Sequence, residues 1–169
     1  MSTWAEPRLT RDADLAVAVA DDADAELLVA ALRERGYSVL AAVEQVATGR
    51  LGTVRLVRPS DSERVVTDLL FASSGIEPEV VEQAIATTVI AGLVLPVACV
   101  GHLIAMKLLA RDDRHRPADA DDLVALSEVA SDEDWNTAQK AIALIVERGF
   151  GRGRDLDTAL HDLRMTRNP

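Results

Sequence analysis

Apolar and polar positions alternate through much of the first half of the chain, which is the pattern of half-buried β-strands. Where the alternation coincides with β-branched residues, we expect strands at 12–19, 37–42, 52–58 and 64–71. A short polar turn joins the last two of these strands. The segments 51–57 and 65–71 should therefore pair as an antiparallel hairpin.

Apolar residues have the spacing of an α-helix once between these strands, and again through most of the second half of the chain. One apolar face predicts a helix over 23–35, and Gly36 is a natural stop for it. Beyond a short helix at 77–85 and one or two short strands within 87–97, we expect helices at 100–111, 118–129, 134–148 and 156–163. This order predicts an α+β protein, with a small mixed β-sheet and a crossover helix followed by a helical C-terminal part. We place a sheet domain at 1–98 and a helical region packed on it at 99–169.

Composition narrows the class of protein. The chain has 169 residues, 49% of them apolar, and a formal net charge of −10, which disfavours a generally basic nucleic-acid clamp. Cys99 is the single cysteine, so an internal disulfide is impossible and a reducing, cytoplasmic location is expected. The longest apolar stretch, 85–100, is interrupted by polar and turn residues and is shorter than a membrane span.

Three aspartates are candidates for chemistry. Asp12 and Asp14 stand two apart on a predicted strand, so their carboxylates share one face and could converge on a hard cation such as Mg²⁺. Alternatively, they are a solvated polar entry to the strand. Asp68 interrupts an apolar strand, where an unpaired charge is costly. It either completes a three-carboxylate site for one or two divalent ions, faces solvent at a sheet edge, or pairs with an arginine such as Arg55 across the hairpin.

Lys107 stands among apolar residues of a predicted helix. It either extends its ammonium group to water or meets an anion, for which a phosphate would serve. Asp119 and Asp122 are three apart, share a helix face, and could reach the same cleft as Lys107.

Four segments, taken in order, resemble the nucleotidyltransferase superfamily, and within it the AbiEii-type abortive-infection and toxin–antitoxin proteins. They are P-R-L-T-R-D-A-D-L at 7–15, T-D-L-L at 67–70, H-L-I-A-M-K-L-L-A at 102–110 and R-P-A-D-A-D-D-L at 116–123. The resemblance implies transfer of a nucleoside monophosphate from an NTP to a hydroxyl of RNA or protein, in a toxin–antitoxin setting with an antitoxin partner.

The same resemblance implies roles for individual residues. Asp12, Asp14 and Asp68 would be the catalytic carboxylates and the Mg²⁺ ligands, with Asp68 also helping to deprotonate the acceptor hydroxyl. Nucleotide contacts would come from a second group: Thr10, Arg11, Lys107, Asp119 and Asp122. Ala118 stands where the family segment has a lysine.

The chain also departs from the family pattern at its start. The usual first helix and its glycine turn, whose amides hold the phosphates, would precede Pro7, which implies a shortened or degenerate member. We expect weak Mg²⁺-dependent nucleotide binding, and an exposed apolar strip beside Val17 and Val19 that favours a homodimer. The alternative function is a non-catalytic interaction or regulatory module of the same fold.

Overall fold

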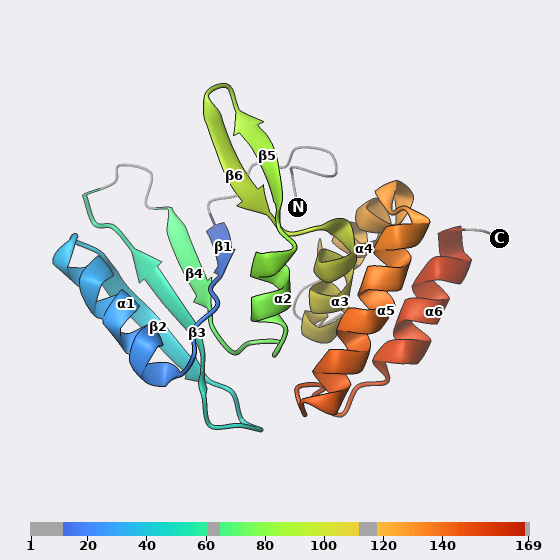
Figure 1. Ribbon diagram of the computed structural model, residues 1–169, viewed down its shortest axis with the longest axis horizontal. Helices are drawn as coiled ribbons and strands as arrows, with labels where there is room; N and C mark the ends of the chain where they lie inside the picture. The colour runs from blue at the N-terminus through green and yellow to red at the C-terminus, as the bar shows by residue number, and fades with distance from the viewer. Residues whose placement is uncertain (1–11, 61–64, 112–117, 168–169) are drawn as a thin grey trace. The chain divides into compact units, whose positions relative to one another are not determined.

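The computed structural model describes residues 12–60, 65–111 and 118–167, and Figure 1 shows the order of their elements. The described residues form two compact units, one ending at Val81 and the other beginning at Glu82. The first contains the four-stranded sheet and the second contains a two-stranded hairpin and four helices. The boundary between the two units therefore lies before the hairpin. The domain boundary expected from the sequence, between residues 98 and 99, lies after the hairpin.

The first unit is a mixed sheet with one long helix against it. Its elements are β1 (Asp12–Ala16), α1 (Asp22–Glu34), β2 (Ser38–Glu44), β3 (Leu51–Val57), β4 (Val66–Leu70) and α2 (Glu77–Glu82). The strand order is β1-β4-β3-β2, with β1 parallel to β4 and β3 antiparallel to both its neighbours. The helix α1 thus connects the two edge strands of the sheet. The expected mixed sheet with a crossover helix and the β3–β4 hairpin are confirmed.

Local sequence signals set the ends of α1. The Asp21 side chain accepts a hydrogen bond from the backbone N–H of Asp24 at 3.1 Å, as a helix N-cap does. At the other end Gly36 has φ of 88°, and the N–H groups of Gly36 and Tyr37 donate to the carbonyls of Arg33 and Leu32. This is the glycine-based stop that the sequence predicts.

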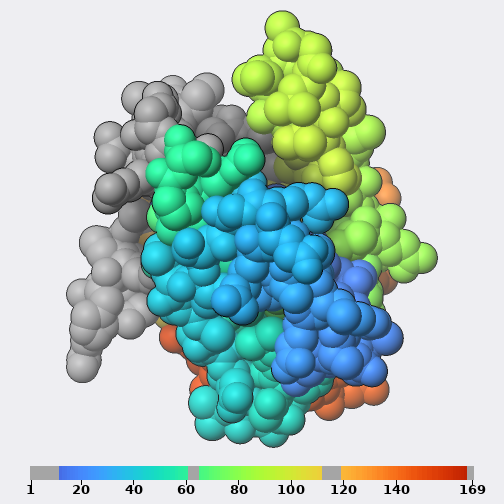
Figure 2. All heavy atoms as spheres, turned by 90° about the vertical axis from the view of Figure 1, so that its left-hand side faces the viewer, coloured from blue at the N-terminus to red at the C-terminus, as the bar shows by residue number. Residues whose placement is uncertain are grey.

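One face of the sheet is covered by α1. Ala25 of the helix is buried in a core with four residues of the sheet and its edge: Val54, Leu56, Leu69 and Phe71. Figure 2 shows α1 in blue beside the cyan strand β2 on this side of the unit. Because side chains alternate along a strand, the residues between these core positions point to the opposite face of the sheet.

The expected apolar strip near β1 is present only in part. Val17 and Val19 are partly buried and pack against the core under α1. Leu15 and Leu27 remain 48% and 69% exposed. The two valines therefore pack against the core that includes Ala25 of the crossover helix, whereas Leu15 and Leu27 stay exposed.

The second unit consists of the hairpin and the helices. Its elements are β5 (Ile85–Ile90), β6 (Leu93–Val97), α3 (Val100–Ala110), α4 (Ala118–Val129), α5 (Asp132–Glu147) and α6 (Leu156–Arg167). The strands pair antiparallel in a sheet of their own. The helices pack on one another around buried side chains that include Ile104, Leu126, Trp135 and Ile142. Four helices after the strands are what the spacing predicts.

Candidate functional site

The strand register brings the predicted carboxylates together on one face of the sheet. Asp14 on β1 is the register partner of Asp68 on β4, and Asp68 is also the partner of Arg55 on β3. Asp12 lies two residues before Asp14 and therefore points the same way. We call these four residues the acidic row. It lies on the face opposite α1, because each strand alternates between the row and the core.

Arg55 and Asp68 form the most direct contact in the acidic row. Arg55 Nε donates to Asp68 Oδ1 at 2.8 Å, and Arg55 Nη2 donates to Asp68 Oδ2 at 2.7 Å. The hydrogen bonds and charge of Asp68 raise the pKa of Arg55 above its ordinary value, and the charges of Asp12 and Asp14 add to this. Of the alternatives for Asp68, pairing with Arg55 across the hairpin is therefore the one observed.

The carboxylate oxygens of the acidic row are suitable ligands for Mg²⁺. However, the three carboxylates are not arranged around a common ion position. Carboxylate oxygens are the ligands that this hard cation prefers, and Asp12 and Asp14 are exposed at their strand. Both oxygens of Asp68 are bound by Arg55. Within residues 12–60, 65–111 and 118–167, no group of three or more His, Cys, Asp or Glu side chains is arranged to hold a metal ion.

Lys107 meets anions from its own chain. Its ammonium group donates to Asp119 Oδ1 and to Asp122 Oδ2, each at 2.8 Å, and so joins α3 to α4. Burial lowers the pKa of Lys107, but hydrogen bonds and charges from the two aspartates outweigh it, and the pKa lies above its ordinary value. The sequence placed Asp119 and Asp122 within reach of Lys107 but did not identify them as its partners.

The Lys107 cluster retains an unsatisfied acceptor. Asp119 and Asp122 are 6% and 7% exposed. Within the described part of the chain, Asp119 Oδ2 is buried and has no hydrogen-bond partner. A buried carboxylate oxygen in this state favours any ligand that brings a donor group.

The remaining sequence candidates add little to the site. Thr10 and Arg11 lie outside the described residues. The thiol of Cys99 has a raised pKa, chiefly because of burial, which makes it a poor nucleophile.

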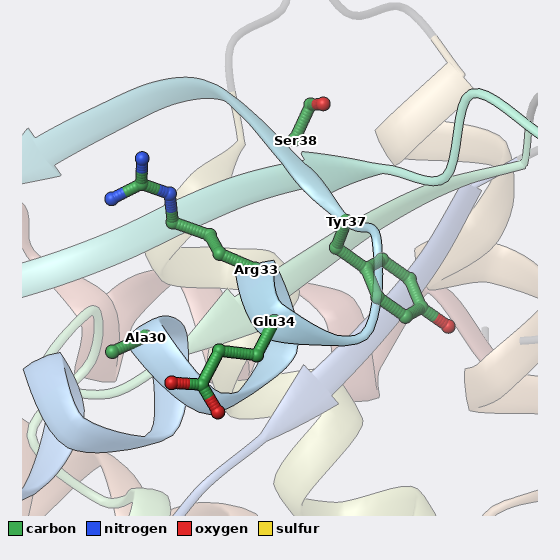
Figure 3. A pocket seen from close by; sticks show the side chains of 5 residues that line it. All are labelled: Ala30, Arg33, Glu34, Tyr37 and Ser38. Carbon is green, nitrogen blue, oxygen red and sulfur yellow. The ribbon is translucent and has the colours of Figure 1, made fainter.

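A shallow pocket lies at the end of α1, away from these residues. It is lined by Ala30, Arg33, Glu34, Tyr37 and Ser38. In Figure 3 the Arg33 guanidinium and the Glu34 carboxylate point in different directions, so they do not converge on one ligand. No residue of the acidic row lines this pocket.

The described residues form an α+β protein with three aspartates on one face of its mixed sheet. A family model described as "Nucleotidyl transferase AbiEii toxin, Type IV TA system" matches residues 1–168, and the chain belongs to this family. Nucleotidyl transfer and a toxin–antitoxin role, with an antitoxin partner, follow at the level of the family. No curated protein matches the chain. Across the described residues, none of the helices has the length and apolar character needed to cross a membrane.

Proposed function

We propose that the protein transfers a nucleoside monophosphate from an NTP to a hydroxyl group of RNA or protein. The observation that carries this proposal is the acidic row, which places the three family-motif aspartates on one sheet face of a chain that belongs to a nucleotidyltransferase family. In the reaction, the acceptor oxygen bonds to the α-phosphorus, the α–β phosphoanhydride bond breaks, and pyrophosphate leaves. The acceptor proton passes to the Asp68 carboxylate.

Mg²⁺ is the proposed cofactor, with Asp12, Asp14 and Asp68 as its ligands. A bound divalent ion would neutralise triphosphate charge and favour ionisation of the acceptor hydroxyl. Asp12 and Asp14 offer exposed carboxylates for this purpose. Asp68 would contribute to the site in competition with Arg55, which donates one N–H to each Asp68 oxygen.

The nucleotide is the proposed ligand of the Lys107 cluster, together with Thr10 and Arg11. Asp119 Oδ2 would accept a hydrogen bond from a ribose hydroxyl or a base amino group, which supplies its missing donor. Lys107, already held by Asp119 and Asp122, would place its positive charge near a phosphate. The protein would act in the cytoplasm, as a homodimer.

A non-catalytic module of the same fold is the second candidate, and the Arg55–Asp68 pair favours it. In such a module the pair would satisfy Asp68 permanently, as a structural cross-strand contact.

Label transfer from nucleotides separates the two functions. The protein is incubated with each α-³²P-labelled NTP, Mg²⁺, and bulk tRNA or cell protein. We expect one nucleotide to label one acceptor class, and D12N/D14N to lower the labelling roughly 100-fold because it removes the metal ligands. Asp162 is exposed on α6 and provides the control D162N, which should label like wild type. Equal labelling by D12N/D14N and D162N, or none by wild type, would contradict transfer by the acidic row.

A further inference from the structure

We propose that Arg55 competes with divalent cations for Asp68, so that opening of the Arg55–Asp68 ion pair strengthens the binding of an ion by the three aspartates. This inference rests on the proposed function, in which the three aspartates bind Mg²⁺. It explains how Asp68 would exchange its ion pair with Arg55 for a bound cation. It makes Arg55 a positioning residue for the reaction, acting through Asp68.

The first argument is geometric. A planar guanidinium and a carboxylate that share two parallel hydrogen bonds make one of the stronger polar contacts in proteins. Here the two bonds measure 2.8 and 2.7 Å and use one oxygen each. Each Asp68 oxygen already accepts one arginine N–H, so an incoming cation must either share an oxygen with the guanidinium or displace an arginine N–H.

The second argument is electrostatic. Asp12, Asp14 and Asp68 together carry a formal charge of −3, and Arg55 reduces the charge of the row to −2. The charges of Asp68, Asp12 and Asp14 all contribute to the raised pKa of Arg55. A positive charge held about 6 Å from a divalent cation repels it enough to weaken binding about tenfold, even at the dielectric constant of water.

The third argument is exposure, which decides which partner moves. The Arg55 side chain is 44% exposed and the Asp68 side chain only 12%. The Arg55 guanidinium can therefore turn towards water, where it is hydrated, whereas the Asp68 carboxylate stays in the sheet. Opening of the pair leaves a largely buried carboxylate without a counter-ion, which is the state that binds a cation most favourably.

The hairpin itself does not depend on this pair. Five register pairs join β3 to β4, from Thr53–Leu70 to Val57–Val66. On the opposite face Val54, Leu56 and Leu69 are buried under α1. Replacement of Arg55 should therefore leave the sheet folded, so that its effect on ion binding is measurable.

Binding of Mn²⁺ alone, without nucleotide, tests the inference. We would titrate Mn²⁺ into the full chain at low ionic strength and follow the free ion by electron paramagnetic resonance. We expect R55Q to bind Mn²⁺ about tenfold more tightly than wild type, and the added D68N substitution to remove that gain. R58Q is the matched control, because Arg58 lies over the Tyr37 ring, 5.8 Å from its centroid, rather than on an aspartate. R58Q should bind like wild type.

R55K provides a second variant that keeps the charge and loses the guanidinium fork, and we expect a smaller gain from it. If R55Q does not fold, the same comparison is made with R55K. Mn²⁺ affinity in the folded variant that does not exceed that of R58Q would overturn the inference, and so would a gain that persists with D68N. The assay involves no nucleotide, so a gain in Mn²⁺ affinity without any label transfer would refute the proposed function and leave the Arg55 competition standing.

Discussion

The buried carboxylates among the described residues differ in the kind of partner that they have. Asp68 pairs with Arg55 on the neighbouring strand, and Asp119 and Asp122 share Lys107 of another helix. Glu77 is 1% exposed and is held by the loop that precedes its own helix. Its Oε1 accepts from the N–H and the hydroxyl of Ser74, and its Oε2 accepts from the N–H of Gly75. Both oxygens of Glu77 therefore act as acceptors.

This arrangement predicts that E77Q destabilises the fold although it conserves shape. An amide has one acceptor oxygen, so its NH₂ group would face a donor N–H. We expect a loss of about 1–3 kcal/mol in the free energy of unfolding, measured by urea denaturation. The exposed Glu82 at the end of the same helix supplies the control E82Q, which should change stability little. Equal midpoints for the two variants would refute the proposed acceptor role.

Residue spacing predicted part of the site, because part of it is local. Asp12 and Asp14 share a face by strand alternation alone. The partner of Asp68 depends on the β3–β4 register, and a slip of one residue would put Asp68 on the other face. The partners of Lys107 lie on a different helix, so no local pattern could select them over a phosphate or water.

At the scale of elements, the helices were predicted to within a few residues. The helix α1 spans Asp22–Glu34 between its N-cap Asp21 and Gly36, against the predicted 23–35, and α4 spans Ala118–Val129 as expected. The first strand was predicted through residue 19 but ends at Ala16, because its parallel partner β4 ends at Leu70. The last ladder contact runs from Val17 N–H to the Leu70 carbonyl at 2.9 Å. Strand length is therefore set by the neighbouring strand, which local sequence does not record.

Helix packing gives a second test, at Gly101 on α3. A Cβ atom built at Gly101 would lie 2.7 Å from Thr137 Cβ and against the Asp134 carbonyl oxygen of α5. The helices α3 and α5 are thus in contact at a point where only glycine fits. We expect G101A to lower the free energy of unfolding by about 1–3 kcal/mol through overpacking, despite the higher helix propensity of alanine.

The matched control for this prediction is G151A. Around Gly151 the nearest atom to an added Cβ is Val146 Cγ2 at 3.6 Å, which is an ordinary contact. Urea midpoints of the two variants should differ clearly, with G151A close to wild type. A G101A protein as stable as G151A would show that α3 and α5 can separate at no cost.

At the scale of the whole molecule, charge and apolar exposure are distributed unevenly. The chain has a net charge of −10, yet the hairpin segment Ile85–Val97 contains no charged residue. Its exposed apolar side chains are Ile85, Val89, Ile90, Leu93, Val94 and Leu95. The exposed Leu27 on α1, by contrast, follows the acidic residues Asp24 and Glu26. Two copies of an acidic chain repel one another least through the hairpin, whereas a basic partner would be drawn to the acidic surface.

Pro96 determines which edge of the hairpin is open. Proline has no N–H to donate, so its pairing with Ala86 must be of the non-hydrogen-bonded kind, with the missing donor facing outward from β6. The outer edge of β6 is therefore blocked near its C-terminal end. Among the residues that the structure describes, β5 pairs with β6 alone, and the N–H groups of Ala86 and Thr88 face its other edge, where a strand could add. Since an isolated two-stranded sheet is marginally stable, addition of a second β5 would stabilise the hairpin.

These features predict that the proposed homodimer forms by antiparallel pairing of two β5 strands about a two-fold axis. We expect sedimentation equilibrium to give a dimer that tightens as salt is added, because salt screens repulsion between two acidic copies. I90E introduces like charges at the interface and should give a monomer. V46E makes the same change at a residue that is 99% exposed outside the hairpin, and it should remain a dimer. At about 100 μM a homodimer of micromolar affinity would be almost fully formed. A wild-type monomer at this concentration would contradict the dimer. A dimeric I90E would show that the dimer interface lies elsewhere than on β5.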